Sequence, residues 1–309
     1  MKLTHWMRRE CSGLAFTTLE LAEEEERQGH QIRVHEPSAE TAILSKFDGP
    51  PDVHCIHSQI GMETYHDRIP KVMWMHGEPL GSVGNGISMR AIVDLAPSCE
   101  AFICMRKDEW PIWNAIKRTY LVRKGVDLQR FHPMNGTAPE KLGGDPAVLY
   151  YENWRGDRNP LILCQAMVDV VKRFPKAQLH LYNCPGGKMA DTFLKLMKHC
   201  RWYTFLKTLH GSEPDVNALL NRADIVVSCN YPLYARGIEA FAAGKPFICP
   251  GYHEHEYPFT CELEVGSMAR AIIQCWEESG KIDYRTWAEQ HHNVADTVAE
   301  SLDVYRRFL

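Results

Sequence analysis

The chain has 309 residues, of which 45% are hydrophobic and 24% are charged, a balance typical of a folded globular protein with room for two domains. Its formal net charge of -4 at pH 7 argues against proteins that bind nucleic acid through overall positive charge. The 11 cysteines are an odd number without CxxC or zinc-ligand spacing, so we interpret them as buried thiols of a reducing compartment.

The first third of the chain alternates short apolar runs with amphipathic stretches. MKLTHWM is followed by a predicted turn at Ser12 and Gly13, and then by a helical pattern over 14–30 in which EEEER (23–27) is interpreted as a solvated face. Extended runs follow at 31–37, 52–58, 71–77, 101–107 and 119–125. Strands that alternate with helices predict a mainly parallel sheet covered on both faces.

Residues 133–147, PMNGTAPEKLGGDPA, have the proline, glycine and polar composition of an interdomain linker. The alternation then resumes, with strands predicted at 147–153, 177–183, 224–230 and 245–251 and helices at 160–175, 214–223 and 237–244. We predict two doubly wound α/β domains, 1–137 and 138–295, and a C-terminal helix within 296–309 that packs back towards the first domain. In such sheets, ligands bind beyond the carboxyl ends of the strands.

The short helix predicted at 237–244 carries one carboxylate, Glu239, in its first turn. Gly237 lets a ligand approach the backbone closely, and the N-terminus of a helix favours phosphate. A carboxylate accepts hydrogen bonds from the two adjacent hydroxyls of a ribose. Glu239 is therefore a candidate for binding a nucleotide ribose; the alternative is an acid that only complements the helix dipole.

Three stretches resemble motifs of one enzyme family. IEAFAAGKPFI (238–248), preceded by ADIVVSC, is similar to the LEAMAxGxPVV signature of retaining GT-B glycosyltransferases of family four (glycosyl transferases group 1). VRKGVDLQRFHP (122–133) resembles the family's IPNGVDxxxFxP, and VLYYENWRGDRNPLILCQA (148–166) resembles the strand, basic loop and helix that open its second domain. The resemblance implies a compact α/β protein of the GT-B type: two Rossmann-like domains that face an interdomain cleft, with the acceptor side in the first and the nucleotide sugar in the second.

The resemblance implies that two basic residues after the first strand of the second domain hold the donor diphosphate, where this chain has Arg155 and Arg158. Guanidinium groups supply planar pairs of donors for phosphate oxygens and neutralise charge as the nucleoside diphosphate leaves. Arg158 matches the family's lysine, whereas the family's arginine aligns near Asn153, so Arg155 is a substitute by proximity. His76 matches a histidine that touches the donor sugar. These comparisons predict His76, Arg155 and Arg158 as the catalytic residues.

Other predicted contacts lie at the ends of strands. The loop after the first strand occupies the place of the family's glycine-rich loop but has one glycine where two are usual, and Tyr231 stands where the family often has a second acid. His57 and Glu78 are candidates for contact with the acceptor. The predicted donor-binding residues are Ser12, Gly13, Arg155, Arg158, Asn230, Tyr231, Tyr234, Arg236, Gly237, Ile238 and Glu239.

The sequence thus predicts a retaining, metal-independent transferase that moves a hexose from a nucleotide sugar, with UDP-glucose favoured, to an acceptor hydroxyl. The acceptor is expected to be a saccharide, a protein or a hydroxylated base in DNA. By resemblance, the leaving diphosphate helps to deprotonate the acceptor, so no general base is named. Two alternatives stay open: a sugar-nucleotide epimerase of the same fold, and a non-catalytic nucleotide-binding protein, which Tyr231 suggests.

No cofactor and no metal are expected. The sequence has no Asp-x-Asp motif in a metal-binding context, and the two histidines of HEHEY (253–257) lack an evident third ligand. No run of about 18 apolar residues marks a membrane-spanning helix, and the opening MKLTHWMRRE lacks the apolar core of an export signal. We therefore expect a cytoplasmic protein without integral membrane association.

Overall fold

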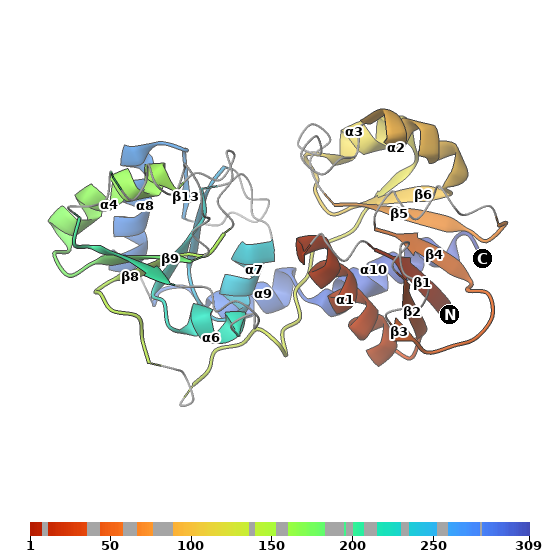
Figure 1. Ribbon diagram of the computed structural model, residues 1–309, viewed down its shortest axis with the longest axis horizontal. Helices are drawn as coiled ribbons and strands as arrows, with labels where there is room; N and C mark the ends of the chain where they lie inside the picture. Colours follow the sequence, from red (N-terminus) through yellow and green to blue (C-terminus); the bar gives the residue numbers. More distant parts are fainter. Residues whose placement is uncertain are drawn as a thin grey trace. The chain divides into compact units, whose positions relative to one another are not determined.

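Two sheets form the framework of the chain in the computed structural model (Figure 1). The structure describes residues 1–7, 12–35, 44–57, 67–76, 89–135, 140–152, 160–182, 195, 200–206, 215–229, 235–251, 259–278 and 280–309. The chain divides into two compact units, Met1–Asp127 with His292–Leu309, and Leu128–His291. The division lies earlier than the predicted boundary at residues 137 and 138, and the chain returns to the first unit at His292 rather than at 296.

The first unit contains a seven-stranded sheet in the order β3-β2-β1-β4-β5-β6-β7. All neighbouring strands run parallel except β2 and β3, which are antiparallel. The strands are β1 (Lys2–Trp6), β2 (Gln31–His35), β3 (Leu44–Ser45), β4 (Val53–Ile56), β5 (Lys71–Met75), β6 (Ala101–Cys104) and β7 (Thr119–Leu121). The helices are α1 (Ser12–Arg27), α2 (Met89–Leu95), the 3-10 turn η3 (Ala96–Ser98), α3 (Trp110–Ile116) and α10 (Val294–Arg306).

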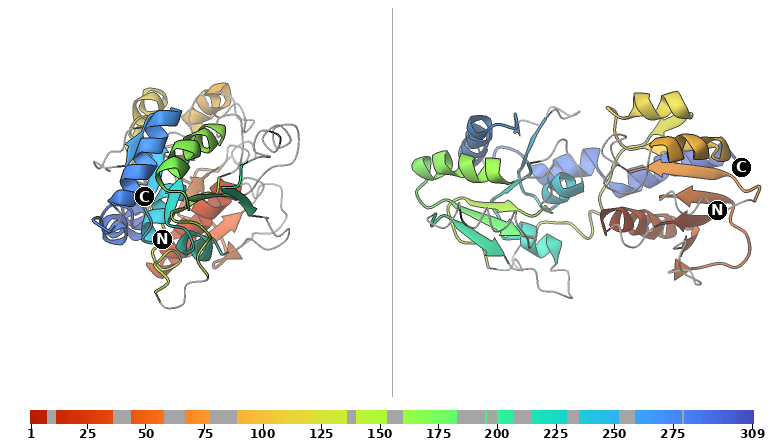
Figure 2. Two further views of the ribbon diagram at one scale, coloured as in Figure 1. Left: turned by 90° about the vertical axis from the view of Figure 1, so that its left-hand side faces the viewer. Right: turned by 45° about the horizontal axis from the view of Figure 1, so that its top comes forward.

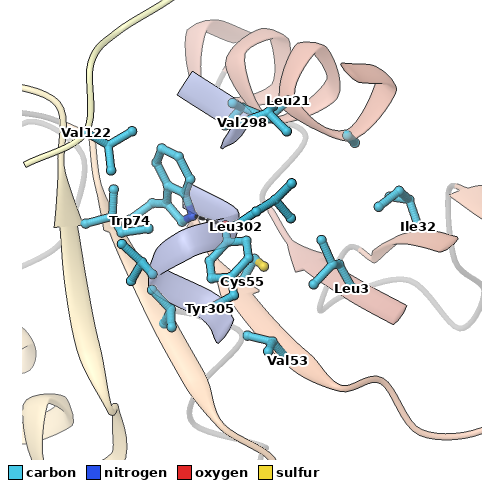
Figure 3. Packing of buried hydrophobic residues seen from close by; sticks show 14 of the residues in the cluster. Leu3, Leu21, Ile32, Val53, Cys55, Trp74, Val122, Val298, Leu302 and Tyr305 are labelled. Atoms are coloured by element: carbon cyan, nitrogen blue, oxygen red, sulfur yellow. Dashed lines mark hydrogen bonds between the residues drawn. The ribbon is translucent and has the colours of Figure 1, made fainter. Parts of the chain in front are cut away.

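Alternation along the strands divides the core of the first unit into two layers. On β5, Trp74 belongs to the cluster that contains side chains of α1 and α10, whereas Met73 and Met75 belong to the cluster beneath α2 and α3. Figure 3 shows the first cluster, in which Trp74 Nε1 donates a hydrogen bond to Tyr305 Oη at 2.9 Å. This bond satisfies the polar atoms of two large buried aromatic side chains and ties α10 to the sheet.

Two sequence interpretations of α1 were wrong. Ser12 and Gly13 do not form a separate turn, because α1 already begins at Ser12. The EEEER run is not wholly solvated, because Glu25 is fully buried and Glu24 is nearly so. Five consecutive helical residues sweep well over a full turn, and Glu25 lies four residues after Leu21, on the face that packs against the sheet.

The segment VRKGVD closes the first unit against the start of α10. A short parallel bridge joins Val126 to Asn293, with hydrogen bonds from Val126 N to His292 O and from Val294 N to Val126 O. A Cβ at Gly125 would lie 2.5 Å from the Cα of Val294, so this close approach requires glycine. The glycine of the family-like motif therefore has a packing role here.

The second unit contains a six-stranded parallel sheet in the order β10-β9-β8-β11-β12-β13. The strands are β8 (Ala147–Tyr150), β9 (Gln178–Tyr182), β10 (Tyr203–Leu206), β11 (Ile225–Val227), β12 (Phe247–Pro250) and β13 (Thr260–Cys261). The helices are α4 (Leu161–Arg173), α6 (Val216–Asn221), α7 (Ala235–Ala242), α8 (Val265–Glu277) and α9 (Tyr284–His291). Helices α4 and α8 lie side by side on one face of the sheet (Figures 1 and 2).

The described part of the predicted linker is packed onto the second unit. The backbone N–H group of Met134 donates to the side-chain oxygen of Asn221 on α6 at 2.9 Å, and that of His132, just before the segment, donates to Asn217 at 3.0 Å. The carbonyl oxygen of Glu140 accepts from Arg222 at 2.8 Å. Arg285 on α9 donates to the carbonyl oxygens of the preceding residues. The segment thus has the composition of a linker, but polar side chains of the second unit hold its described part in place.

The cysteines in the described ranges agree with the prediction of buried thiols. All nine cysteines in the described ranges are free thiols, and eight of them are buried. Within the same ranges, no helix has the length and apolar character needed to cross a membrane.

Candidate functional site

Each sheet has one point at which the strand order reverses. In the second unit the chain proceeds from β8 to β9 on one side and later to β11 on the other; in the first unit, β1 lies between β2 and β4 in the same manner. In open α/β sheets, the crevice beyond the strand ends at this switch point is the usual site for a ligand. The residues that follow β8, β11, β1 and β4 are therefore the first to consider.

In the second unit, Tyr151 and Glu239 meet at the switch point. Tyr151 directly follows β8, and the single hydrogen of its buried hydroxyl is shared between Glu239 Oε2, 3.0 Å from Oη, and the carbonyl oxygen of Arg236, 2.7 Å from Oη. The Arg236 guanidinium lies over the Tyr151 ring, 4.9 Å from its centroid, and 3.4 Å from Glu239 Oε2. Both contacts of the Glu239 carboxylate use Oε2, and Oε1 forms no hydrogen bond with any described residue.

Glu239 affects the pKa values of both Tyr151 and Arg236. Burial, followed by the Glu239 carboxylate, raises the pKa of Tyr151 well above its usual value, so the phenol stays protonated and remains a donor. Burial is the largest single effect on Arg236 and lowers its pKa, but Glu239, Tyr151 and Glu152 together outweigh burial and raise the pKa of Arg236 above its usual value. The Glu239 side chain is 13% exposed and that of Arg236 is 34% exposed. A carboxylate held in this way, with one oxygen open, can accept hydrogen bonds from a ligand's hydroxyl groups.

A second acid lies next to the first. Glu152 is buried beside Tyr151, and its Oε2 accepts a hydrogen bond from the hydroxyl of Ser228, which follows β11, at 2.8 Å. The bond joins the ends of β8 and β11 across the switch point. Because Glu152 is adjacent to Tyr151 in the chain, this bond fixes the backbone from which Tyr151 projects.

The position of Glu239 in its helix differs from the prediction. Helix α7 begins at Ala235 and has no acid in its first turn, so Glu239 lies in the second turn. The pattern missed this because the helix starts before Gly237, which the sequence suggested as its first residue. Ile238 is buried in the core, so only its backbone is available to a ligand. Glu239 is thus positioned by Tyr151 rather than by the end of the helix dipole.

In the first unit, His57 and His76 lie at neighbouring strand ends. His57 follows β4 and His76 follows β5, and His57 Nδ1 lies 2.8 Å from His76 Nε2. Burial, followed by the neighbouring histidines, lowers the pKa of His57 well below its usual value. Burial, followed by the charge of Lys124, lowers the pKa of His76 to about 3. Both rings are therefore neutral near pH 7.

Several predicted site residues lie outside the described residues: Glu78, Arg155, Arg158, Asn230, Tyr231, Tyr234 and the HEHEY segment. Ser12 and Gly13 are described only through the backbone of α1. No group of three His, Cys, Asp or Glu side chains in the described ranges is arranged to hold a metal ion. The structure therefore brings together Arg236, Glu239 and their neighbours in one unit, and His57 and His76 in the other.

Sequence reasoning missed four polar residues at these switch points: Tyr151, Glu152, His5 and Glu25. The available signal was their position. Tyr151 and Glu152 are the first residues after a fully buried strand, and His5 is a polar residue within one. Glu25 was hidden in a run of acids, where only the helical phase relative to Leu21 distinguishes it.

Neither a protein-family model nor a curated protein matches this sequence. Solved structures are similar over nearly the whole chain. Sucrose-phosphate synthase from Thermosynechococcus elongatus is 12% identical with a TM-score of 0.76, and covers 99% of this chain and 98% of its own. A glycosyltransferase from Rickettsia africae is 12% identical with a TM-score of 0.72; the match covers 99% of this chain and 98% of that enzyme. HepE of Anabaena, solved in complex with UDP and glucose, is 14% identical with a TM-score of 0.73; the match covers 99% of this chain and 100% of HepE. The chain has the two-domain α/β fold of these enzymes, the GT-B fold.

Proposed function

We propose that this protein is a glycosyltransferase whose nucleotide-sugar donor binds at the switch point of the second unit. The observation that carries the proposal is the Tyr151–Glu239–Arg236 group, which holds a carboxylate with one free oxygen beyond the ends of β8 and β11. Glu239 accepts hydrogen bonds from the ribose hydroxyls, and Tyr151 is the positioning residue that orients it. The HepE structures with UDP and UDP-glucose support a uridine nucleotide as the first donor to test.

The diphosphate contacts are proposed for Arg155 and Arg158, on the strength of the sequence motif alone. As the bond between the sugar C1 and the phosphate oxygen breaks, its electron pair stays on the diphosphate, and guanidinium groups stabilise the added charge. The motif resemblance also supports transfer with retention, without a metal ion, and with a hexose as the transferred group. Asn230, Tyr231, Tyr234, Gly237 and Ile238 belong to the same proposed donor site of the second unit. Ser12 and Gly13 of the first unit are proposed as donor contacts from the sequence resemblance alone.

The acceptor hydroxyl is proposed to bind on the first unit, near the strand ends that carry His57 and His76, with Glu78 as a further contact. A saccharide, a protein or a hydroxylated base in DNA each supplies such a hydroxyl. Conversion of the donor into its epimer in the absence of any acceptor would instead support the alternative of a sugar-nucleotide epimerase.

The proposal is tested by calorimetric titration with UDP, GDP and ADP and their glucose conjugates. A ligand at about 100 times its Kd should raise the free energy of unfolding by about 2.7 kcal/mol, which gives an independent thermal-shift readout. Glu239→Ala should weaken binding at least about tenfold, because a hydrogen bond to a charged group contributes about 1.5–3 kcal/mol.

The matched control is Glu140→Ala, an exposed acid of the same unit whose backbone oxygen, not its carboxylate, accepts from Arg222. It should bind as the unaltered protein does. If no nucleotide or nucleotide sugar binds, or if Glu239→Ala binds as tightly as the control, the proposed donor site is wrong.

A further inference from the structure

Exposed aliphatic side chains are concentrated on the first unit. Among the described residues, five large hydrophobic side chains are more than 40% exposed: Val93, Ile112, Leu121, Val168 and Leu309. All of them except Val168 belong to the first unit. Val93 lies on α2 and Ile112 on α3, the helices that cover the face of the sheet opposite to α10 (Figure 1). Single exposed aliphatic residues are common on proteins, so the question is whether their neighbours extend them into a surface.

Two apolar stripes meet at a surface pocket between α2 and α3. Ile112 shares a face of α3 with Ala115 and Ile116, which follow it by three and four residues and are exposed and half-buried. Val93 and Pro97 approach the same pocket from α2 and η3. The pocket has a volume of about 410 Å³ and is lined by Val93, Ala96, Pro97, Ala115, Ile116 and Lys117. The exposed apolar side chains of the two helices therefore form one continuous surface.

Three cations border this surface on the side of β7. Lys117 is the one charged residue that lines the pocket, and Arg118 follows it directly before β7. The Arg118 guanidinium lies over the ring of Tyr120, 5.0 Å from its centroid, and the guanidinium of Arg307, after α10, lies 5.1 Å from the same centroid. None of the three cationic groups forms an ion pair or a hydrogen bond with a described residue.

The charge of this border favours an anionic partner. Asp94 on α2 and Glu100 before β6 are exposed acids of the same region, and neither forms an ion pair with Lys117, Arg118 or Arg307. Because both guanidinium groups lie over one ring, their charges are close together. Guanidinium groups that stack on an aromatic ring keep their N–H groups available for phosphate oxygens.

We propose that this surface of the first unit docks onto an anionic phospholipid bilayer. Val93, Ile112 and the pocket between α2 and α3 contact the boundary of the acyl chains, while Lys117, Arg118 and Arg307 contact the phosphate groups. Each cation near an anionic membrane surface contributes about 1 kcal/mol, which is about fivefold in binding. None of these residues belongs to the proposed donor or acceptor site, so the inference does not depend on the proposed function.

The size of the apolar part favours a bilayer over a folded protein partner. A stable protein interface buries about 800 Å² on each partner around an apolar core. The few aliphatic side chains around one pocket are too small for such a core. At a bilayer, shallow insertion of a few apolar side chains is sufficient when cations add their attraction to anionic lipids.

Co-sedimentation of the full chain with two kinds of vesicle tests the proposal. We expect binding to vesicles of phosphatidylcholine mixed with phosphatidylglycerol, and binding at least about tenfold weaker to phosphatidylcholine alone. Binding to the mixed vesicles should be lost as the NaCl concentration rises from about 0.1 to about 1 M, because the Debye length falls from about 10 to about 3 Å. Absence of binding to the mixed vesicles, or equal binding to both kinds, would overturn the proposal.

Removal of the two arginines tests the charged part. The double variant Arg118→Ala with Arg307→Ala should bind the mixed vesicles at least about tenfold more weakly, because each cation contributes about fivefold. The matched control is Lys172→Ala with Arg173→Ala on α4, which removes the same charge from the second unit, where the two cations pair with Asp169 and Glu277. The control should bind as the unaltered protein does.

Ile112→Asp tests the apolar part. The substitution places an acid in the first turn of α3, where the helix dipole favours it, so the variant should fold, as thermal unfolding will show. We expect binding to the mixed vesicles to fall at least about tenfold, because a charge replaces an apolar contact and repels the anionic surface. Val168→Asp, at a similarly exposed position on α4, is the control. If Ile112→Asp or the double arginine variant binds as tightly as its control, the proposed surface is wrong.

Discussion

Removing the hydroxyl of Tyr151 tests how the candidate donor site is held. In Tyr151→Phe, the largely buried carboxylate of Glu239 and the carbonyl oxygen of Arg236 lose the hydroxyl hydrogen that they share, at 3.0 and 2.7 Å from Oη. A hydrogen bond to a charged group contributes about 1.5–3 kcal/mol, and the partners left behind are shielded from water. We therefore expect the free energy of unfolding to fall by about 2 kcal/mol, which corresponds to roughly 4–8 °C in Tm for a domain of this size.

The assay is a double-mutant cycle by chemical denaturation, with Tyr151→Phe, Glu239→Ala and the combined variant. If the two side chains act through their hydrogen bond, the cost of Tyr151→Phe should shrink by about 1 kcal/mol or more in the Glu239→Ala background. The same variant should bind UDP more weakly, because Glu239 is no longer oriented. Strict additivity of the two substitutions, together with unchanged UDP affinity, would refute the positioning role of Tyr151.

Three further predictions concern the first unit. Gly125→Ala should lower the free energy of unfolding by about 3 kcal/mol or more in a denaturation experiment, because the new Cβ meets the backbone of Val294 at 2.5 Å; a loss below about 1 kcal/mol would contradict the close approach. Asn293→Ala should cost about 1 kcal/mol through loss of the helix cap, with Asn293→Asp as the control that retains an acceptor. The pKa values of His54 and His76 in the folded protein are about 4 and about 3, below the unfolded value of 6.5. Unfolding therefore takes up protons, and the free energy of unfolding should fall as the pH drops from about 6.5 to 4. Each ring contributes up to about 1.4 kcal/mol per pH unit, and a free energy of unfolding that stays constant from pH 7 to 5 would count against both pKa values.

The sequence was sufficient to predict the class of fold, because strands and helices place their apolar residues at different and recognisable spacings. Runs such as KVMWM are fully buried, and the structure has them as central parallel strands. Boundaries were harder to predict. The segment 133–147 has a linker's composition, yet Met134 is fixed by the side chain of Asn221 on α6, 87 residues later in the chain.

The candidate site shows the same limit. Glu239 was identifiable because its motif is local, whereas its partner Tyr151 is 88 residues away and shares no pattern with it. His5 and Glu25 meet across 20 residues, through the packing of α1 on β1. Such contacts depend on sheet order, which composition and periodicity do not record. Local motifs therefore indicated the ribose acid, and only the three-dimensional arrangement revealed what positions it.

The central claim is that Glu239 binds the ribose of a nucleotide donor, and comparing UDP with 2′-deoxy-UDP tests it most directly. In the unaltered protein, removal of one ribose hydroxyl should weaken binding about tenfold, which corresponds to about 1.4 kcal/mol. In Glu239→Ala, where the acceptor of that hydroxyl is gone, the two nucleotides should bind within about twofold of each other. Equal discrimination between the two nucleotides in both proteins would contradict the account.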